Sequence, residues 1–567
     1  MFRPSVLSSA VLIATLGLTA CGGGSSTSSP APVVPVPPVI PTLPTPVAVG
    51  DTVALTNSGA LISFNRASPA TLVGTIAVTG LASGESLVGI DVRPANNTLY
   101  ALGSLGNLYT VVPSTGVATQ VAKLAADAAD LTAPFTALSG TSFGIDFNPV
   151  ADRLRVISNN GQDLRINVET GATTTDGDIT PAGNVISGSG YTNSFAGATN
   201  TRLFNINLTT STLDLQDPPN NGSQVSGPAL GVTPTAADFD IDALNNIGYA
   251  SITVGGASSL YQVNMQTGAA APAATLVGAI AGGEPVRSIA LVQAAAPQVT
   301  GLTTSNGLFT FSPRTPNTIS AVVPITGLGV GENILGIDVR PQDGLLWALS
   351  STGRLYTLDA ATGAATFKVA ISATLDGSPN ASVDFNPAAN RLRVVTSGGQ
   401  NLRIAVVDIP AAGATPAVAA GTTITDGAIN RTGGAPSLVV AAAYSNNFAP
   451  VTGLTPATVL FDIDATADVL AQQAPPNNGT LVDVGPLGID INTAASFDIA
   501  GGENGMVLGA VQAANTGPFL LRSLNLATGA VGPYNFTSTG TPTTDALSQI
   551  GGATGPAVRD IAITLKK

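Results

Sequence analysis

Short runs of alternating apolar and polar residues recur along the chain from residue 50 onward, separated by turn-forming pairs. The run LVGIDVRP at 87–94 leads into LYALGS and GNLYTVVPSTG, and the pattern returns loosely as FGIDFNP, RLRVISN and QDLRINVETG. A period of two predicts strands, and the Asn-Gly, Gly-Asn and Thr-Gly pairs predict the turns between them. Each unit of about 35–45 residues therefore predicts four short strands, and such units in series, without helical periodicity, indicate β-propeller blades.

A larger repeat covers the whole body of the chain. GESLVGIDVRP at 84–94 returns as GENILGIDVRP at 331–341, and DFNPVADRLRVISNNGQDLRI at 146–166 returns as DFNPAANRLRVVTSGGQNLRI at 384–404. The shorter motifs TDG, YTNSF or YSNNF, and PPNNG also recur in the same order. This pattern predicts a tandem duplication of one large domain.

The ends of each copy predict how its blades close. Each copy ends on a strand, VRSIAL at 286–291 or VRDIAI at 558–563, but begins on segments that look like the second and third strands of a blade. A C-terminal strand that supplies the missing first strand would close each copy into a ring of about five blades. We therefore predict an all-β protein with two tandem β-propeller domains, at 49–294 and 295–567. The alternative is one ring of about ten blades.

The repeated motifs resemble the DUF4394 domain, a family of unknown function. The resemblance is carried by the GIDxRP, LYAL and GxLY segments, by DFNPxxDRLRVxSxxGQNLRI, and by the TDG and PPNxG stretches. It covers nearly the whole chain after the first fifty residues, twice. Because the family has no assigned activity, the resemblance implies the domain and no reaction.

The first residues have a different pattern, which predicts export and lipid attachment. A short basic start is followed by an apolar stretch from Val6 to Leu18, too short for a good membrane span. The sequence Leu-Thr-Ala-Cys that ends at Cys21 resembles the lipobox of bacterial lipoproteins, in which the cysteine takes a diacylglycerol after cleavage. Cys21 is the only cysteine of the chain. We predict a signal peptide at 1–20 and lipidation of Cys21.

The segment 21–48 predicts a linker between the lipid anchor and the domains. Its first part is rich in Gly and Ser and its second part in Pro, which is typical of a flexible piece followed by a semi-rigid polyproline spacer. Residue Gly22 follows the lipidated position instead of Asp. By resemblance to lipoprotein sorting in Gram-negative bacteria, this favours the outer membrane.

Composition removes several classes of function. The chain has 34 acidic and 21 basic residues and a net charge of -13, so a nucleic-acid partner is not expected. It has no histidine, the commonest general base, so neither a Ser-His-Asp nor a Cys-His mechanism is available. A single cysteine excludes a disulfide within the chain and a thiolate zinc cluster.

Arginines at equivalent places of the two copies are the most informative polar residues. In GIDVRP, Asp91 and Arg93 lie on one strand face and are able to pair, and in DRLRV the residues Arg153 and Arg155 share a face. We favour Asp–Arg pairs that neutralise polar positions between packed blades. Alternatively, these arginines line a central channel and hold a carboxylate or sugar acid, with the tyrosines of the YTN and YSN motifs beside them. The candidate ligand-binding residues are Arg93, Arg153, Arg155, Arg165, Tyr191, Arg340, Arg391, Arg393, Arg403 and Tyr444.

Alternating carboxylates in DFDID and FDID are candidates for a calcium site, because Ca²⁺ prefers six to eight oxygen ligands. A D-x-[DN]-x-[DN]-G loop is missing from the sequence, and the Asp-Gly pairs in the two TDG segments are typical of plain turns. We expect no cofactor, with Ca²⁺ as the alternative. The candidate ligands are Asp238, Asp240, Asp242, Asp462 and Asp464.

These features favour a non-catalytic, membrane-tethered binding module of the cell envelope with a protein or glycan partner. A first alternative is a hydrolase or lyase that uses Asp or Ca²⁺ on a sugar or lactone. A second is a structural component of the envelope or matrix. An enzyme predicts paired carboxylates converging at one channel mouth, a binding module predicts an aromatic or Arg-lined concavity, and a structural component predicts neither.

Overall fold

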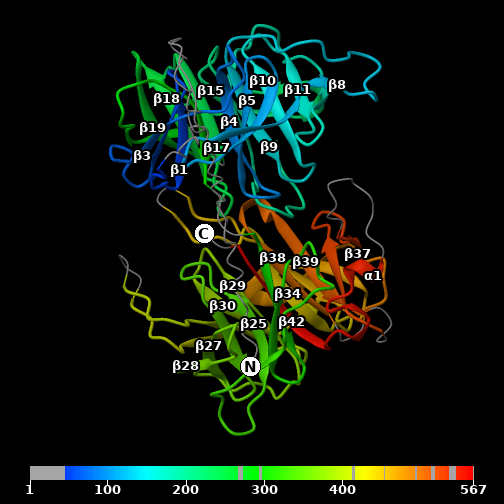
Figure 1. The fold of residues 1–567 in the computed structure, drawn as a ribbon. Helices are drawn as coiled ribbons and strands as arrows, with labels where there is room; N and C mark the ends of the chain where they lie inside the picture. Colours follow the sequence, from blue (N-terminus) through cyan, green and yellow to red (C-terminus); the bar gives the residue numbers. More distant parts are fainter. Residues whose placement is uncertain are drawn as a thin grey trace, which may run out of the picture. The chain divides into compact units, whose positions relative to one another are not determined.

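The computed structural model describes residues 45–265, 272–292, 296–411, 416–451, 454–491, 495–512, 517–534 and 545–565. The predicted signal peptide, Cys21 and most of the predicted linker lie outside these residues. The regular secondary structure of the described residues is almost entirely strand (Figure 1), and their one α-helix is the four-residue α1 (Asp545–Ser548). Among the described residues, no helix has the length and apolar character that crossing a membrane requires.

The first copy forms five sheets, each with four strands in the order innermost to outermost. The third blade has an added short strand, β8 (Ala125–Ala126), beside its outermost strand. In blade order the strands are β21 (Val286–Leu291), β1 (Thr52–Thr56), β2 (Ala60–Phe64) and β3 (Leu72–Ala77); β4 (Leu87–Arg93), β5 (Thr98–Gly103), β6 (Asn107–Val111) and β7 (Ala118–Lys123); β9 (Phe143–Asn148), β10 (Arg153–Ser158), β11 (Asp163–Ile166) and β12 (Ala172–Thr175); β13 (Ile186–Tyr191), β14 (Leu203–Asn207), β15 (Thr212–Gln216) and β16 (Gln224–Val225); β17 (Ala236–Ile241), β18 (Gly248–Val254), β19 (Ala257–Val263) and β20 (Ala274–Ala279).

The second copy repeats this arrangement blade for blade, with β33 (Asn430–Arg431) added in parallel to the outermost strand of its fourth blade. Short 3-10 turns include η1 (Pro219–Asn221) and its counterpart η2 (Pro476–Asn478), followed by η3 (Gly502–Asn504) and η5 (Gly552–Thr554). The strands are β42 (Val558–Thr564), β22 (Gln298–Thr303), β23 (Gly307–Phe311) and β24 (Val323–Pro324); β25 (Ile334–Val339), β26 (Leu346–Ser350), β27 (Arg354–Leu358) and β28 (Ala365–Ala370); β29 (Ala381–Asn386), β30 (Arg391–Thr396), β31 (Asn401–Ile404) and β32 (Thr423–Thr425); β34 (Val439–Tyr444), β35 (Leu460–Asp464), β36 (Val469–Gln473) and β37 (Thr480–Pro486); β38 (Ala495–Ala500), β39 (Met506–Val511), β40 (Leu520–Leu524) and β41 (Val531–Pro533).

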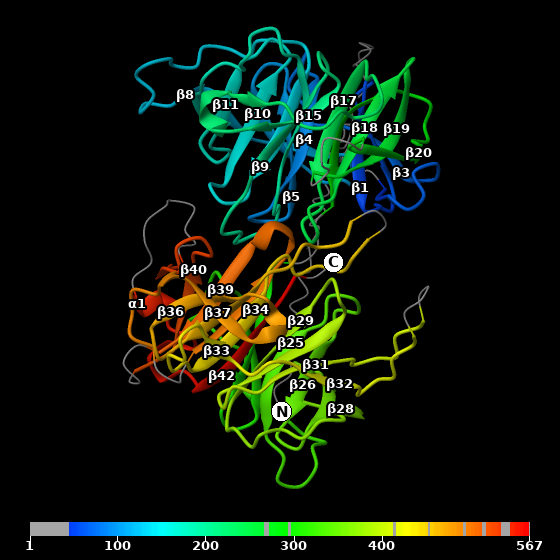
Figure 2. The same cartoon turned by 180° about the vertical axis from the view of Figure 1, so that it is seen from behind.

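Each copy closes on itself through its last strand. In the first copy β21 pairs antiparallel with β1, with Leu291 opposite Thr52, and in the second copy β42 pairs with β22, with Thr564 opposite Gln298. The innermost strands β4, β9, β13, β17 and β21 contact one another in turn, and β21 returns to β4. Figure 2 shows β4, β9 and β17 of this ring from behind. The prediction of two five-bladed propellers is confirmed, because β21 completes the first blade of its own ring.

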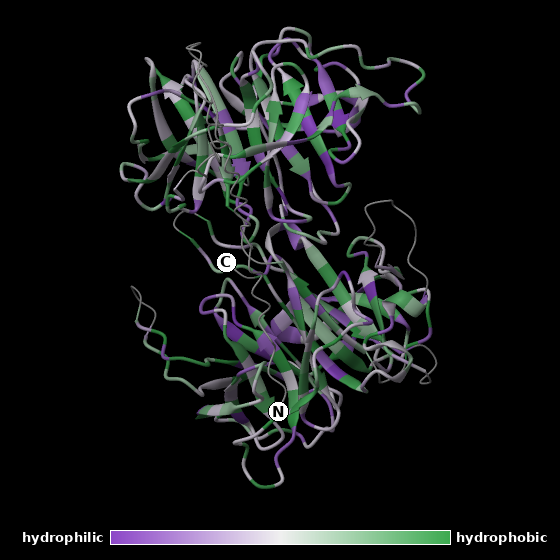
Figure 3. Ribbon diagram, viewed as in Figure 1, coloured by the Kyte–Doolittle hydropathy of each residue, from purple (hydrophilic) through white to green (hydrophobic). Residues whose placement is uncertain are grey.

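The core lies between neighbouring blades and is densest at the innermost strands. All seven residues of β4 are buried, whereas five of the six residues of the outermost strand β7 are at least partly exposed. Figure 3 shows apolar residues interspersed with polar ones along the strands of both copies. Aromatic rings recur at equivalent places, because Tyr100 packs edge-on against Phe147 and Trp347 packs likewise against Phe385. The apolar packing therefore sets the blade spacing and holds the polar residues described next.

Candidate functional sites

Buried aspartates and serines join the innermost strands of the first ring. The Asp91 carboxylate on β4 accepts a hydrogen bond of 2.7 Å from the backbone N–H of Phe147 on β9. Such bonds satisfy amides on strand edges that face no further strand. The same kind of bond joins Asp146 to the amide of Tyr191, Ser187 to that of Ala237, Asp240 to that of Leu291 and Ser288 to that of Ile90. All five blade boundaries of the ring are bridged in this way.

Three of these aspartates converge at the centre of the ring. Asp91, Asp146 and Asp240 each offer one carboxylate oxygen, and the three oxygens lie within 4.8 Å of one another. The three side chains are buried, and burial is the main cause that raises the pKa of each. For Asp240 the pKa is raised to about 6, and the charge of Asp240 in turn raises the pKa of Asp91 and Asp146.

The second ring has an equivalent cluster. Asp338, Asp384 and Asp498 lie at the matching strand positions, and their oxygens also lie within 4.8 Å of one another. They accept backbone N–H bonds from the next innermost strand, as their counterparts do. Burial raises the pKa of Asp498 to about 7. We call these two sets of three residues the carboxylate triads.

The calcium candidates inferred from the sequence fall at different places. Asp240 belongs to a triad, and Asp238 lies two residues earlier on the same strand, where it accepts the amide of Ile289. Asp242 pairs with Arg66 at 2.6 Å and Asp464 pairs with Arg431 at 2.7 Å.

Asp462, the remaining calcium candidate, is fully buried, and neither of its carboxylate oxygens has a hydrogen-bond partner in the part of the chain that the structure describes. Burial raises its pKa to about 8.

Asp91 and Arg93 do not pair with each other, contrary to the sequence interpretation. Both oxygens of Asp91 accept backbone N–H groups, from Val92 and Phe147. The Arg93 guanidinium instead reaches Asp152 at 2.5 Å, in the turn that precedes β10 of the next blade. In the second ring Arg340 bonds to Asn390, at the place of Asp152, and pairs with Asp343. Arg93 is therefore matched by a charge across the blade boundary, whereas Arg340 pairs with an acid of its own blade and reaches only a neutral amide in the next one.

Arg155 and Arg393 join the third blade to the fourth in each ring. Arg155 is 1% exposed, and its Nη1 donates to Asp163 at 2.7 Å and to Asp176 at 2.6 Å. Its Nε donates to the hydroxyl of Tyr191 on β13, and Arg165 forms a bidentate pair with Asp176. In the second ring Arg393 donates to Asn401, Asp426, Tyr444 and Asn477, and Arg403 forms a bidentate pair with Asp426. These contacts pair each of the four arginines with acidic or polar groups of its own ring.

Arg391 and Arg153 differ from the other candidate arginines. Arg153 donates to the backbone oxygens of Ala151 and Asp152 beside it. Nη1 of Arg391 is buried and has no hydrogen-bond partner among the described residues. Burial, together with the charge of nearby Arg403, lowers the pKa of Arg391.

Arg391 opens into a cavity of about 230 Å³ between the third and fourth blades of the second ring. Three guanidinium groups line this cavity, and no carboxylate is found among the described residues of its lining. We call it the arginine pocket. Its lining residues are Asn386, Ala389, Arg391, Arg393, Arg403, Tyr444, Pro476 and Asn477.

A family model described as a domain of unknown function, DUF4394, matches residues 60–290 and 307–546. The chain belongs to the DUF4394 family. No curated protein matches the chain. Among solved structures, the Dos1 propeller is similar at 12% identity and a TM-score of 0.23, over 62% of this chain and 90% of that one. The Cps50 (Swd1) β-propeller domain of Myceliophteria thermophila is similar at 12% identity and a TM-score of 0.22, over 67% and 96%. At these TM-scores the propeller assignment depends on the strand pairing itself.

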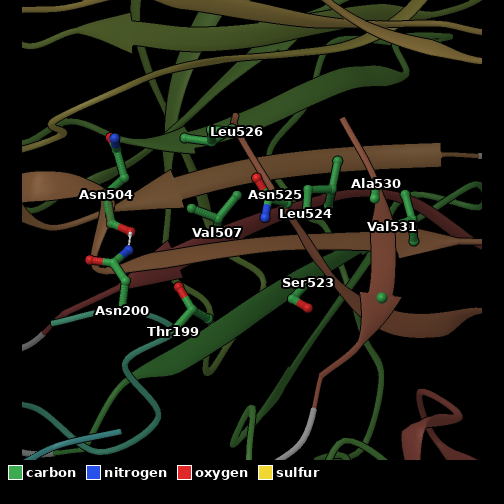
Figure 4. Close-up of a pocket in the computed structure, with 11 residues that line it drawn as sticks. Thr199, Asn200, Asn504, Val507, Ser523, Leu524, Asn525, Leu526, Ala530 and Val531 are labelled. Carbon is green, nitrogen blue, oxygen red and sulfur yellow. Dashed lines mark hydrogen bonds between the residues drawn. The ribbon is translucent and has the colours of Figure 1, made fainter. Parts of the chain in front are cut away.

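A larger cavity, of about 500 Å³, lies beside the fifth blade of the second DUF4394 copy. Figure 4 shows Asn504, Val507, Ser523 and Asn525 along it, and Asn200 donates a hydrogen bond of 2.8 Å to the backbone oxygen of Asn504. Its lining has amides, hydroxyls and aliphatic groups but no ionisable side chain. It therefore offers no acid, base or charge for chemistry.

The sequence reasoning missed five of the six triad residues. Asp91 and Asp338 stand in GIDVRP, and Asp146 and Asp384 stand in DFNP, both of which were recognised as motifs of the DUF4394 copies. The available signal was that each motif places one aspartate in a strand otherwise apolar enough to be innermost. The aspartates meet only because the blades close into a ring, and no local sequence pattern indicates which of them meet.

Proposed function

We propose that this DUF4394 protein is a non-catalytic binding module of the cell envelope, tethered to the outer membrane through lipidated Cys21. We further propose that the arginine pocket binds a small ligand that carries a carboxylate, such as a sugar acid. The observation that carries this proposal is the buried, unpartnered Nη1 of Arg391 in a cavity with two further guanidinium groups.

The chemistry of the pocket favours an anion. A buried donor without a partner costs on the order of 1–3 kcal/mol, and a ligand carboxylate would remove that cost. The planar guanidinium group matches a carboxylate with two parallel hydrogen bonds. Asp426 is hydrogen-bonded to Arg393 and Arg403, whereas Arg391 has no bound carboxylate.

The size of the pocket favours a small ligand. A cavity of about 230 Å³ lies below the range of roughly 300–1,000 Å³ that is usual for drug-sized ligands. The hydroxyl of Tyr444 and the amides of Asn386 and Asn477 lie in the wall and are groups that bind sugar hydroxyls. A single sugar-acid residue fits this combination of size, charge and polar wall.

The burial of the carboxylates favours a binding function over hydrolysis. Paired carboxylates do converge in each ring, but Asp91 is 3% exposed, Asp146 0% and Asp240 2%. A general acid must come within about 2.6–3.2 Å of the atom that it protonates, and a glycosidic oxygen is excluded from such a depth. The lining of the arginine pocket has no carboxylate that could replace them.

Isothermal titration calorimetry with D-glucuronate tests the proposed ligand class, with D-glucose as the neutral probe. The mature chain and Arg153→Gln should bind glucuronate, Arg391→Gln should lose at least tenfold in affinity, and glucose should give no heat. Arg153→Gln is the matched control because it removes the equivalent arginine of the first copy, whose guanidinium donates to the backbone oxygens of Ala151 and Asp152. The fluorescence of Trp347, the only tryptophan, reports whether the second ring of Arg391→Gln is folded. Binding that is equal in Arg391→Gln and the parent chain would refute the assignment.

Mass spectrometry of the mature N-terminus tests the anchor separately. We expect a diacylglycerol-modified Cys21 as the first residue. An unmodified cysteine, or cleavage at another bond, would show that the tether is wrong while leaving the pocket proposal intact.

A further inference from the structure

The carboxylate triads differ from the other polar clusters of the two rings in their charge balance. Buried Arg155 and Arg393 are each matched by acidic partners. In the first triad, the neighbouring charges that act on Asp91 and Asp146 are those of other aspartates. In the second triad, Asp338 and Asp384 are likewise acted on by Asp498 and Asp560. Among the described residues, the main charges that act on Asp91, Asp146, Asp338 and Asp384 are therefore those of other aspartates. Asp240 also lies near Arg66, whose positive charge lowers its pKa against the effect of burial.

Individual carboxylate oxygens at the triads also have no partner. Oδ2 of Asp146 in the first ring and Oδ1 of Asp498 in the second accept no hydrogen bond from any described residue, although both side chains are almost completely excluded from solvent. Beside the first triad, Oδ1 of Asp238 is also unpartnered, and the charge of Asp238 acts on Asp91 and Asp146. A buried acceptor without a donor is unfavourable unless another group, such as a cation, occupies the space beside it.

We infer that each ring binds one divalent cation of the Ca²⁺ type at its centre, between Asp91, Asp146 and Asp240 in the first ring and between Asp338, Asp384 and Asp498 in the second. Ca²⁺ binds oxygen at about 2.3–2.6 Å, so two of its ligands on opposite sides lie roughly 5 Å apart. Oxygens within 4.8 Å of one another fit around one such ion. Because a carboxylate oxygen has more than one lone pair, an oxygen that accepts a backbone amide still binds a cation.

The recurrence of the triads in two diverged copies supports a shared ligand. The triad occupies the same three blades in both rings, while the acidic residue beside it changes place. In the first ring this neighbour is Asp238 on β17, where the second ring has Ser496, and in the second ring it is Asp560 on β42, where the first has Ser288. Each ring therefore has four buried acids at its centre, and the fourth acid stands on a different strand in each ring. This site is separate from the arginine pocket, and its test does not depend on the proposed function.

Metal analysis of the purified mature chain tests the inference. After equilibration with CaCl₂ and gel filtration, plasma mass spectrometry should find two Ca²⁺ per chain, one for each ring. Asp146→Asn and Asp384→Asn should each lose one ion, and the double variant should lose both. Asp462→Asn is the matched control, since Asp462 is equally buried but lies outside the triads, and it should keep both ions.

A second measurement covers variants that fail to fold. For the unaltered chain, EGTA should lower the midpoint of thermal unfolding, and added Ca²⁺ should restore it. A chain that holds no divalent metal after equilibration and unfolds at the same temperature with and without EGTA would overturn the inference. Loss of an ion from Asp462→Asn would also overturn it, because the ion would then lie elsewhere.

Discussion

Replacing Asp462 with Asn should stabilise the second ring, and the first ring shows why. Asn205 occupies the equivalent position on β14 and donates to the side-chain oxygens of Gln216 at 2.7 Å and Gln224 at 3.0 Å. In the described part of the second ring both oxygens of Asp462 are unpartnered, and so is Oε1 of Gln473, the counterpart of Gln216. An asparagine at 462 restores the missing donor opposite Gln473.

The size of the effect follows from the raised pKa of Asp462. Burial raises this pKa from 3.8 to about 8, so the folded chain at pH 7 keeps a proton that the unfolded chain has lost. Each pH unit above the unfolded pKa lowers the free energy of unfolding by about 1.36 kcal/mol, which gives a total loss of roughly 4 kcal/mol at pH 7. Since the folded pKa lies above the unfolded value, the unaltered chain loses stability as the pH rises from about 4 towards 8. We expect Asp462→Asn to gain about 2–4 kcal/mol at pH 7, and less at pH 4.

Urea unfolding, monitored by the fluorescence of Trp347, measures this effect in the second ring. Trp347 is 3% exposed on β26, and it is the only tryptophan, so its emission reports the second ring. The difference between Asp462→Asn and the parent chain should grow steadily from pH 4 to pH 8. Asp464→Asn, two positions along β35, is the matched control and should destabilise the ring, because Asp464 pairs with Arg431. A gain for Asp462→Asn that does not change with pH, or a loss of stability, would refute the reasoning.

Three further substitutions test other parts of the second ring. Gly301→Ala places a Cβ 2.2 Å from the Phe309 ring, so calorimetry should show a loss of about 1–3 kcal/mol. Ala562→Pro removes a backbone donor within the closing strand β42, and limited proteolysis should show an opened second ring; unchanged protease resistance would contradict the closure. Glu332 accepts hydrogen bonds from Tyr356, Thr352 and Gly329, which lower its pKa, so its contribution to stability is present above pH 4.5 and lost in more acidic solution. Glu332→Gln should therefore flatten the acid limb of the stability profile, and an unaltered limb would count against this account.

Local patterns were sufficient to predict the fold. Period-two alternation and turn pairs are properties of neighbouring residues, and the unmatched strands VRSIAL and VRDIAI indicated closure of each ring. The added strands β8 and β33 had no such signature, because each has only two residues and pairs in parallel with a distant strand. Strand order was therefore predictable where a blade is continuous in sequence.

The candidate sites depend on contacts across blade boundaries, which a single sequence does not encode. Arg93 was expected beside Asp91, but its partner Asp152 is 59 residues away in the next blade. The residues of the first triad come from three blades, and only the ring brings them together. Residue identity indicated which groups are polar, and ring geometry decided which of them meet.

Differences between the two copies explain why the arginine pocket lies in the second ring. In the first ring Arg155 is hydrogen-bonded to two acids, Asp163 and Asp176. In the second ring Asn401 takes the place of Asp163, so Arg393 keeps one hydrogen-bonded acid, Asp426.

Asp462 would supply the second acid, but with a pKa of about 8 it is mostly protonated at pH 7 and leaves the positive charge uncompensated. The same raised pKa that makes Asp462→Asn stabilising therefore preserves the positive charge of the pocket. It follows that Asp462→Asn should bind glucuronate at pH 7 as the parent chain does, whereas Asn401→Asp should weaken binding by placing an acid beside Arg393.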